Sequence, residues 1–286
     1  MCAPTGFYTG SVDDGTNSRM SLPAILGDPR KIALFLDFDG TLVELAERPD
    51  AVILAETTRS TLRHLADATH GALAIVTGRD IEDIDRLVTP LRLPVAGVHG
   101  LTRRDAAGVV RRPASAATVP DDAAALLAPL LALSPRLLLE RKTAALALHY
   151  RLAPEFAHEC VVAMERVAAS APGLGVTHNK MVVEARPVGA DKGRAVLDFM
   201  REPPFRDRRP VFAGDDVTDE DAFAAVNALG GDSIKIGEGP TSARWRASGT
   251  AEFLAWLHEA AEAARRDAGV RGASSGPMNR DGQAEE

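Results

Sequence analysis

Short apolar runs alternate with amphipathic stretches along most of the chain. Residues 31–37 and 72–76 are nearly continuous apolar runs, the pattern of strands that are buried on both faces of a parallel sheet. Residues 80–88 place their apolar side chains on one helical stripe, and comparable stretches recur later in the chain. This alternation is the signature of βαβ units, so we predict an α/β fold with a Rossmann-like, doubly wound parallel sheet.

The pattern changes over residues 103–187. Residues 145–151 alternate, so that Leu146, Leu148 and Tyr150 share one face of a strand and the intervening residues share the other. Such a strand packs on one side and faces a polar region on the other. Together with two predicted helices, at residues 121–133 and 154–170, and a second alternating strand at residues 180–186, this segment is expected to form an inserted α+β cap domain.

The first pattern resumes after Pro187, and it continues almost to the end of the chain. We therefore predict a discontinuous catalytic core made of residues 21–102 and 188–267. Residues 1–20 and 268–286 show no periodicity and are rich in small and polar residues, as is typical of mobile tails.

The composition argues against several classes of function. Lys and Arg total 33 against 40 Asp and Glu, a net charge of −7, so no excess of positive charge favours nucleic-acid binding. Two cysteines are too few for a disulfide framework and favour a reducing compartment. The apolar runs are too short to cross a membrane. We expect a cytoplasmic protein that binds neither nucleic acid nor membrane.

Two aspartates directly follow the first buried strand, in the segment DFDGT at residues 37–41. The carboxyl ends of strands in an open parallel sheet form the ligand crevice, so Asp37 is expected to point into it. A carboxylate there can attack phosphorus and form an aspartyl-phosphate. Asp39 is then placed to protonate the leaving alkoxide and to deprotonate the attacking water. The alternative is a surface turn rich in Asp and Gly.

A second acidic cluster, GDDVTDED at residues 214–221, follows another apolar strand. Its first carboxylates should meet Asp37 and Asp39 at neighbouring strand ends, where repulsion between like charges requires a cation. Oxygen-only ligands with room for a phosphate favour Mg²⁺. We expect its ligands to be Asp37, the main-chain carbonyl of Asp39, and Asp215.

Two further roles are open for this acidic segment. Asp216 or Asp219 is expected to take part in metal binding, either directly or through water. Thr218 stands just before a predicted helix, where it could instead act as an N-terminal cap. The two roles are compatible with each other.

Two more residues are expected to neutralise a transferred phosphoryl group. Thr77, followed by Gly78 at the end of the second strand, offers a hydroxyl and neighbouring N–H groups next to a helix start. Lys192 begins the helix on re-entry to the core, where its ammonium can pair with the phosphate and the nucleophile. Each feature alone is common in proteins. Their order and spacing along the chain support the prediction that they act together on a phosphoryl group.

These motifs resemble known families. DFDGT (37–41), TGR (77–79), Lys192 and GDD (214–216), in this order, are similar to the four motifs of the haloacid-dehalogenase-like phosphatases. The resemblance implies an Asp nucleophile, an Asp acid/base two residues later and an obligatory Mg²⁺. Over about Lys31 to Leu257, the chain also resembles the trehalose-6-phosphate phosphatases. The segments that carry this second resemblance are GVHG (97–100), ERK (140–142), HYR (149–151), KMVVEARP (180–187), DKG (191–193) and GDDVTDEDAF (214–223).

The second resemblance implies that a set of polar cap residues recognises the sugar. These residues are Glu140, Lys142, Arg151, Lys180 and Glu184. Glu184 shares its strand face with Val182 and Arg186, so its carboxylate is expected to face the crevice. Carboxylates and cations arranged around hydroxyl groups can hold a polar, neutral disaccharide. The alternative is a set of solvated cross-strand ion pairs. We expect His149 to be structural, whereas His99 either contacts ligand or marks the hinge.

The resemblance therefore implies a Mg²⁺-dependent phosphatase that converts trehalose 6-phosphate into trehalose and phosphate, with the cap closing over the core. A related phosphatase for sucrose phosphate or a hexose phosphate would share Asp37, Asp39, Lys192 and Asp215 and would differ in the cap. A phosphosugar sensor without activity is the remaining alternative. The phosphosugar is the expected partner, and association with the trehalose-6-phosphate synthase is a further hypothesis.

Overall fold

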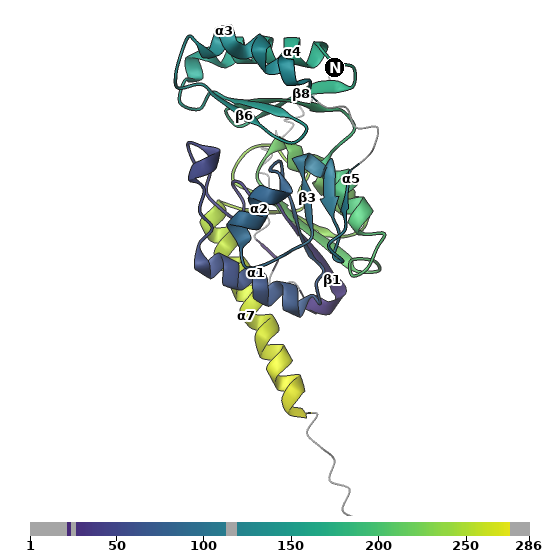
Figure 1. Ribbon diagram of the computed structural model, residues 1–286. Coiled ribbons are helices and arrows are strands. Elements are labelled where there is room, and N and C mark those ends of the chain that lie inside the picture. The colour runs from purple at the N-terminus through teal and green to yellow at the C-terminus, as the bar shows by residue number, and fades with distance from the viewer. Residues whose placement is uncertain (1–21, 24–26, 113–118, 275–286) are drawn as a thin grey trace, which may run out of the picture.

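The structure is a computed structural model that describes residues 22–23, 27–112 and 119–274. Two β-sheets organise these residues, one in the core and one in the cap (Figure 1). The strands of the core sheet are β1 (Ile32–Leu36), β2 (Leu73–Val76), β3 (Val95–Gly97), β4 (Thr102–Arg104), β5 (Val110–Arg111), β10 (Arg209–Gly214), β11 (Asp232–Ile236) and β12 (Trp245–Ala247).

The core sheet confirms the predicted α/β class, although it is mixed. Its strand order is β12-β11-β10-β1-β2-β3-β4-β5. The strands from β12 to β3 pair in parallel, whereas β4 and β5 are antiparallel to their neighbours. Because β1 lies between β10 and β2, the segments that follow these three strands meet at one edge of the sheet.

Helices cover both faces of the core sheet, as the doubly wound prediction requires. One face packs against α1 (Glu56–Ala68), α2 (Ile81–Val88) and α7 (Thr250–Ser274). The other face packs against α5 (Lys192–Phe199) and α6 (Glu220–Ala228). Successive side chains of a strand point to opposite faces, so both sets of β1 side chains are buried, which explains its continuous apolar sequence.

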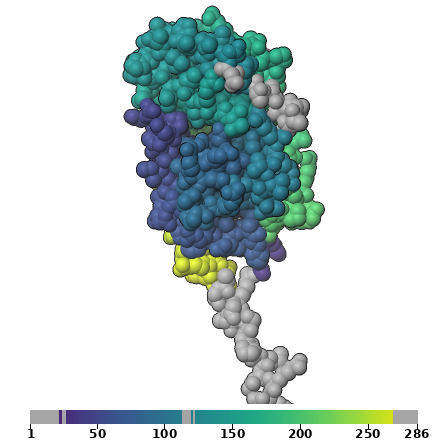
Figure 2. All heavy atoms as spheres, in the orientation of Figure 1, coloured from purple at the N-terminus to yellow at the C-terminus, as the bar shows by residue number. Residues whose placement is uncertain are grey.

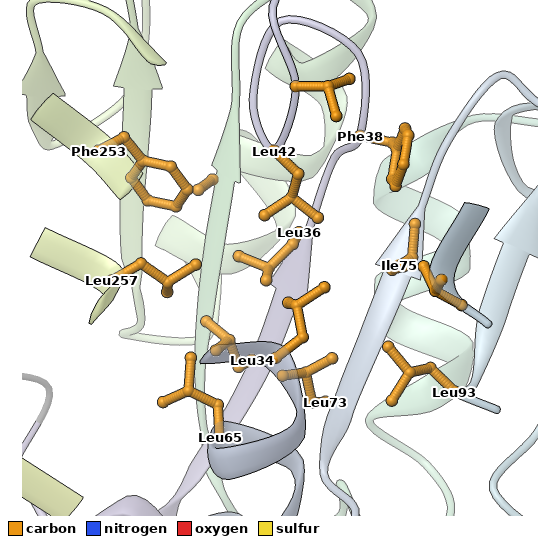
Figure 3. Packing of buried hydrophobic residues seen from close by; sticks show 14 of the residues in the cluster. Leu34, Leu36, Phe38, Leu42, Leu65, Leu73, Ile75, Leu93, Phe253 and Leu257 are labelled. Carbon is orange, nitrogen blue, oxygen red and sulfur yellow. The ribbon is translucent and has the colours of Figure 1, made fainter. Parts of the chain in front are cut away.

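Leu34 of β1 lies in the middle of the larger apolar cluster, close to Leu65 and Leu73 (Figure 3). It is 1% exposed. We expect Leu34→Ala to lower the free energy of unfolding by about 2–5 kcal/mol, because it removes buried methyl groups and leaves a cavity. Urea unfolding measures this loss. Ile53→Ala is the matched control, since Ile53 is 83% exposed and its truncation should leave the unfolding midpoint almost unchanged.

The cap is a separate antiparallel sheet with helices on its outer side (Figure 1). Its strand order is β6-β7-β9-β8. The strands are β6 (Leu138–Arg141), β7 (Leu146–His149), β8 (Leu174–Asn179) and β9 (Val182–Pro187), and the covering helices are η4 (Asp121–Leu127), α3 (Ala128–Leu131) and α4 (Ala157–Ala169). Leu146 and Leu148 pack with Met164 of α4, while His149 faces the core side. The predicted two-faced strand is therefore confirmed.

The cap begins later than the sequence predicts. Residues 103–111 were expected in the cap, but β4 and β5 extend the core sheet as a hairpin beside β3. Arg104 belongs there because its buried guanidinium donates to both oxygens of Asp85, at 2.6 Å each, and to the Leu93 carbonyl. A charged side chain in a sheet gives no apolar signal, and only its partner makes burial possible.

The final helix is longer than expected. Residues 268–274 were assigned to a mobile tail, but they continue α7, which projects away from the core (Figure 1). The packed first half of the helix nucleates it, and each added residue then extends a formed helix. The expected tail residues 1–20 and 275–286 lie outside the described residues. Across the described residues, we find no helix with the length and apolar composition needed to cross a membrane.

Candidate active site

The residues that the sequence singled out for catalysis and sugar binding line one cavity of about 150 Å³ between core and cap, together with Asp215 and Asp216. Asp219 is fully buried behind this lining. The core supplies Asp37, Asp39, Thr77, Lys192 and Asp215, and the cap supplies Glu140, Lys142, Arg151, Lys180 and Glu184. In the space-filling view the cap rests directly on the core (Figure 2). The core residues follow strand ends or begin helices, so the parallel sheet delivers them to a single edge.

Asp37 follows β1 and is almost fully buried. Its Oδ1 accepts a hydrogen bond from Lys192 Nζ at 2.7 Å, and its Oδ2 accepts one from the Thr41 hydroxyl at 3.1 Å. Burial raises the pKa of Asp37 well above its usual value, and Lys192 opposes this rise. The ammonium of Lys192 therefore partly compensates an environment that disfavours charge on this carboxyl group.

Asp37, Asp215 and Asp219 form a buried acidic cluster in which each residue offers one oxygen within 4.8 Å of the others. Burial also raises the pKa of Asp215 above its usual value. Gly40 makes this convergence possible: its φ is +79°, and a Cβ there would lie 2.3 Å from Asp215 Oδ2. A donor set of carboxylate oxygens suits a hard divalent cation such as Mg²⁺.

Asp216 and Asp219 have different positions in the second acidic segment. Asp219 Oδ2 accepts from the main-chain N–H groups of Asp215 and Asp216, at 3.0 and 2.9 Å, and its Oδ1 accepts from Lys192 Nζ at 2.7 Å. Asp216 accepts from the Val217 N–H and caps the turn η6 (Val217–Asp219). Capping thus falls to Asp216 and not to Thr218, since Asp216 is the extended residue that precedes the turn.

Arg79 is a site residue to which the sequence analysis gave no role. Its guanidinium donates to both carboxylate oxygens of Asp39, at 2.7 Å each, and also to the Pro49 carbonyl at 3.2 Å. The Arg79 N–H donates to the hydroxyl oxygen of Thr77 at 3.2 Å. The only sequence signal was its place in TGR, next to the start of α2. These two parallel hydrogen bonds from the guanidinium, called the Arg79 fork below, fix the orientation of both oxygens of Asp39.

The polar cap residues form two buried or half-buried networks across the sheet. Lys142 Nζ and His99 Nε2 each lie 3.0 Å from one oxygen of Glu184. Beside them, His149 Nε2 lies 2.8 Å from Glu140 Oε2. Glu184 is 1% exposed, so the alternative of a solvated surface ion pair does not apply to it.

The turn between β8 and β9 places Lys180 of the cap in contact with the core. Lys180 Nζ lies 2.6 Å from Asp215 Oδ2 and 3.2 Å from the Asp215 main-chain oxygen. Arg151 donates to the Lys180 carbonyl at 3.1 Å and so supports this turn. Asn179 and His149 also line the cavity. The sequence suggested no role for Asn179 and predicted a structural role for His149. The cap and the acidic cluster are thus in direct contact through Lys180.

The charge of Glu184 links the stability of this network to pH. Burial alone would raise the pKa of Glu184, but Lys142 and His99 lower it further, so that the pKa lies below its usual value. A carboxylate with a lowered pKa stabilises the fold above the ordinary pKa of about 4.3, and this contribution is lost as the pH falls. We expect wild type to lose more unfolding free energy than Glu184→Gln on acidification below about pH 5. Urea unfolding at several pH values tests this, and parallel pH curves for the two proteins would contradict it.

Comparison with known proteins places the chain in a family. A family model for trehalose-phosphatase matches residues 35–261. The chain is 43% identical over 230 residues to a trehalose-6-phosphate phosphatase of Escherichia coli K12, covering 79% of this chain and 85% of that protein. It is 46% identical over 220 residues to a probable trehalose-phosphate phosphatase of Sinorhizobium fredii, covering 76% of this chain and 82% of that protein.

Solved structures agree on the fold. The C-terminal domain of the Candida albicans trehalose-6-phosphate phosphatase aligns with a TM-score of 0.73 at 20% identity, covering 86% of this chain and 99% of that chain. A trehalose-6-phosphate phosphatase of Aspergillus fumigatus aligns with a TM-score of 0.57 at 25% identity, covering 86% and 99%. The matched region contains all the residues that line the cavity. The chain therefore belongs to the trehalose-phosphatase family of enzymes.

Proposed function

We propose that this protein hydrolyses trehalose 6-phosphate to trehalose and inorganic phosphate with Mg²⁺ as cofactor. The observation that carries the proposal is the single cavity in which a buried acidic cluster from the core faces paired carboxylates and cations from the cap. The core side suits a phosphoryl group with a divalent cation, and the cap side suits a polar, neutral sugar.

The acidic cluster fits a magnesium ion. Asp37, Asp215 and Asp219 bring carboxylate oxygens close together, and burial raises the pKa of Asp37 and of Asp215 in the absence of further positive charge. Asp37, Asp215 and the main-chain carbonyl of Asp39 would hold the ion, with Asp219 directly or through water. A bound Mg²⁺ supplies positive charge that screens the phosphate from these carboxylates and offsets charge that develops on it.

In the first step, a carboxylate oxygen of Asp37 attacks phosphorus as the bond between phosphorus and the sugar oxygen breaks. Protonated Asp39 gives its proton to the leaving alkoxide. For this step one oxygen of Asp39 must leave the Arg79 fork that holds it here. The products of the step are free trehalose and an aspartyl-phosphate at Asp37.

In the second step, water attacks the aspartyl-phosphate and loses a proton to Asp39. Inorganic phosphate leaves and the carboxylate of Asp37 is restored. Lys192 Nζ, 2.7 Å from Asp37 Oδ1, supplies a fixed positive charge next to the reacting group, and the Thr77 hydroxyl is free to donate because its oxygen accepts from the Arg79 N–H. The cap residues bind the sugar and exclude bulk water.

The test is phosphate release from trehalose 6-phosphate, sucrose 6-phosphate and glucose 6-phosphate, each with Mg²⁺ and with a chelator. We expect a clear preference for trehalose 6-phosphate and loss of activity on chelation that Mg²⁺ restores. Activity on trehalose 6-phosphate no better than on glucose 6-phosphate would favour the related phosphatase. Full activity in the chelator would contradict the magnesium assignment. A cytoplasmic location and association with the synthase stay predictions from the sequence.

A further inference from the structure

His99 has an unusual backbone for a residue other than glycine. It lies in the turn η3 (Val98–Gly100) between β3 and β4, with φ +55°, and Val98 before it has φ +48°. Two main-chain hydrogen bonds hold this turn against the loop that follows β2. His99 N–H donates to the Thr77 carbonyl at 2.8 Å, and Val98 N–H donates to the Arg79 carbonyl at 3.0 Å. Consecutive left-handed residues are costly, and they persist where the surrounding structure fixes them.

The turn directs the imidazole of His99 between the core and the cap. A Cβ at Gly78 would lie 2.7 Å from His99 Nε2, so the ring packs closely against the loop that carries Thr77. The same nitrogen lies 3.0 Å from Glu184 Oε2 of the cap, and His99 is only 4% exposed. One buried ring therefore connects the loop expected to bind the phosphate with the cap carboxylate expected to bind the sugar.

The protonation of this contact follows from its surroundings. Burial lowers the pKa of His99, although Glu184 raises it, so the ring is neutral near pH 7. The carboxylate of Glu184 can only accept, hence the proton is on Nε2 and is donated to Glu184. Nδ1 makes no hydrogen bond to any residue in the described ranges. Among the residues that the structure describes, the hydrogen bond to Glu184 is therefore the only polar contact of the His99 ring.

We propose that His99 is a positioning residue that couples phosphate binding to sugar recognition, by holding the Glu184 carboxylate over the core from the Thr77 loop. Lys142 fixes the other oxygen of Glu184 at 3.0 Å, so the two donors together set the direction of its remaining lone pairs. Sugar hydroxyl groups donate to those lone pairs. This inference rests on the proposed function, in which Glu184 binds the sugar.

The proposal separates substrates that use Glu184 from substrates that do not. A phosphosugar depends on an oriented Glu184, whereas a small aryl phosphate such as p-nitrophenyl phosphate reaches Asp37 without a sugar to recognise. His99→Asn is the informative variant, because Asn tolerates the left-handed backbone and is too short to reach Glu184. His99→Gln is its partner, because the longer amide again places a donor near Glu184.

We expect His99→Asn to lower kcat/KM for trehalose 6-phosphate about tenfold or more, the effect of losing one hydrogen bond to a charged group. The loss should be mainly in KM. Hydrolysis of p-nitrophenyl phosphate should change by less than about twofold, and His99→Gln should recover most of the loss on trehalose 6-phosphate. In the background of Glu184→Gln, His99→Asn should have little further effect, because the two residues act as one unit.

Glu202→Gln is the control, since it removes a partly buried ion pair with Arg103 away from the cavity and should alter neither activity. An equal loss on both substrates, or no loss on trehalose 6-phosphate, would overturn the role of His99. Additive losses in the double variant would overturn it as well. By contrast, a wild-type protein with no preference for trehalose 6-phosphate would defeat the proposed function itself, so the two failures are distinguishable.

Discussion

Asp37→Asn is expected to reduce phosphate release from trehalose 6-phosphate by at least about 10³-fold, because an amide cannot form the aspartyl-phosphate. Asp37 sits at the end of the central strand, 2.7 Å from Lys192 and within the acidic cluster. The nearby Asp39 and Asp215 cannot replace it, since Asp39 is held by Arg79 and Asp215 by Lys180. Steady-state phosphate release with Mg²⁺ measures the effect.

Loss of activity in this variant should come without loss of stability. The raised pKa of Asp37, caused by burial, means that the folded protein disfavours the charged carboxylate relative to the unfolded chain. A neutral amide of nearly the same shape removes that cost, and Lys192 keeps Asp219 as a partner at 2.7 Å. Without added divalent cation, thermal unfolding of Asp37→Asn should occur at or above the wild-type temperature. A variant that retains turnover, or that is inactive because it is unfolded, would refute this account.

Lys192→Met is expected to lower the free energy of unfolding by about 3–5 kcal/mol and to remove activity. Lys192 is 3% exposed and lies 2.7 Å from both Asp37 and Asp219. Burial alone would lower the pKa of Lys192, but Asp219 and Asp37 raise it further, so the ammonium stays charged. Its removal leaves two buried carboxylates facing each other without compensation. Urea unfolding of the metal-free protein measures the loss.

A charge effect can be distinguished from a packing effect by two comparisons. The double variant Lys192→Met with Asp37→Asn should regain part of the lost stability, because one of the two carboxylates is then neutral. The destabilisation should also be smaller near pH 5 than near pH 8. Burial raises the pKa of Asp37, and loss of Lys192 removes the charge that opposes this rise, so Asp37 of the folded variant takes up a proton as the pH falls and the repulsion decreases. A loss that is unchanged by pH and by the second substitution would assign the effect to packing instead.

The fold class followed from features that are local in the chain. Continuous apolar runs such as residues 31–37 are typical of strands buried on both faces. Amphipathic helices between such strands favour a doubly wound sheet. That topology places residues following the strands at one edge, so Asp37, Thr77 and Asp215 could be grouped before their distances were known. The place of the β4–β5 hairpin in the core sheet was missed, because this polar hairpin has no apolar pattern.

By itself, the sequence determined the α/β class, because strand burial follows from short-range patterns of side chains. It also nominated an inserted cap and the candidate site residues, and these stay predictions of domain role and of function. The partners of those residues were decided only by the tertiary structure. Two of these contacts, between Arg79 and Asp39 and between His99 and Glu184, join residues up to 85 positions apart. The role of Asp216 as the N-terminal cap of η6 depends on its backbone angles. Hydrogen bonds are directional and short, so a sequence pattern can nominate a charged side chain, but only the folded chain can select its partner.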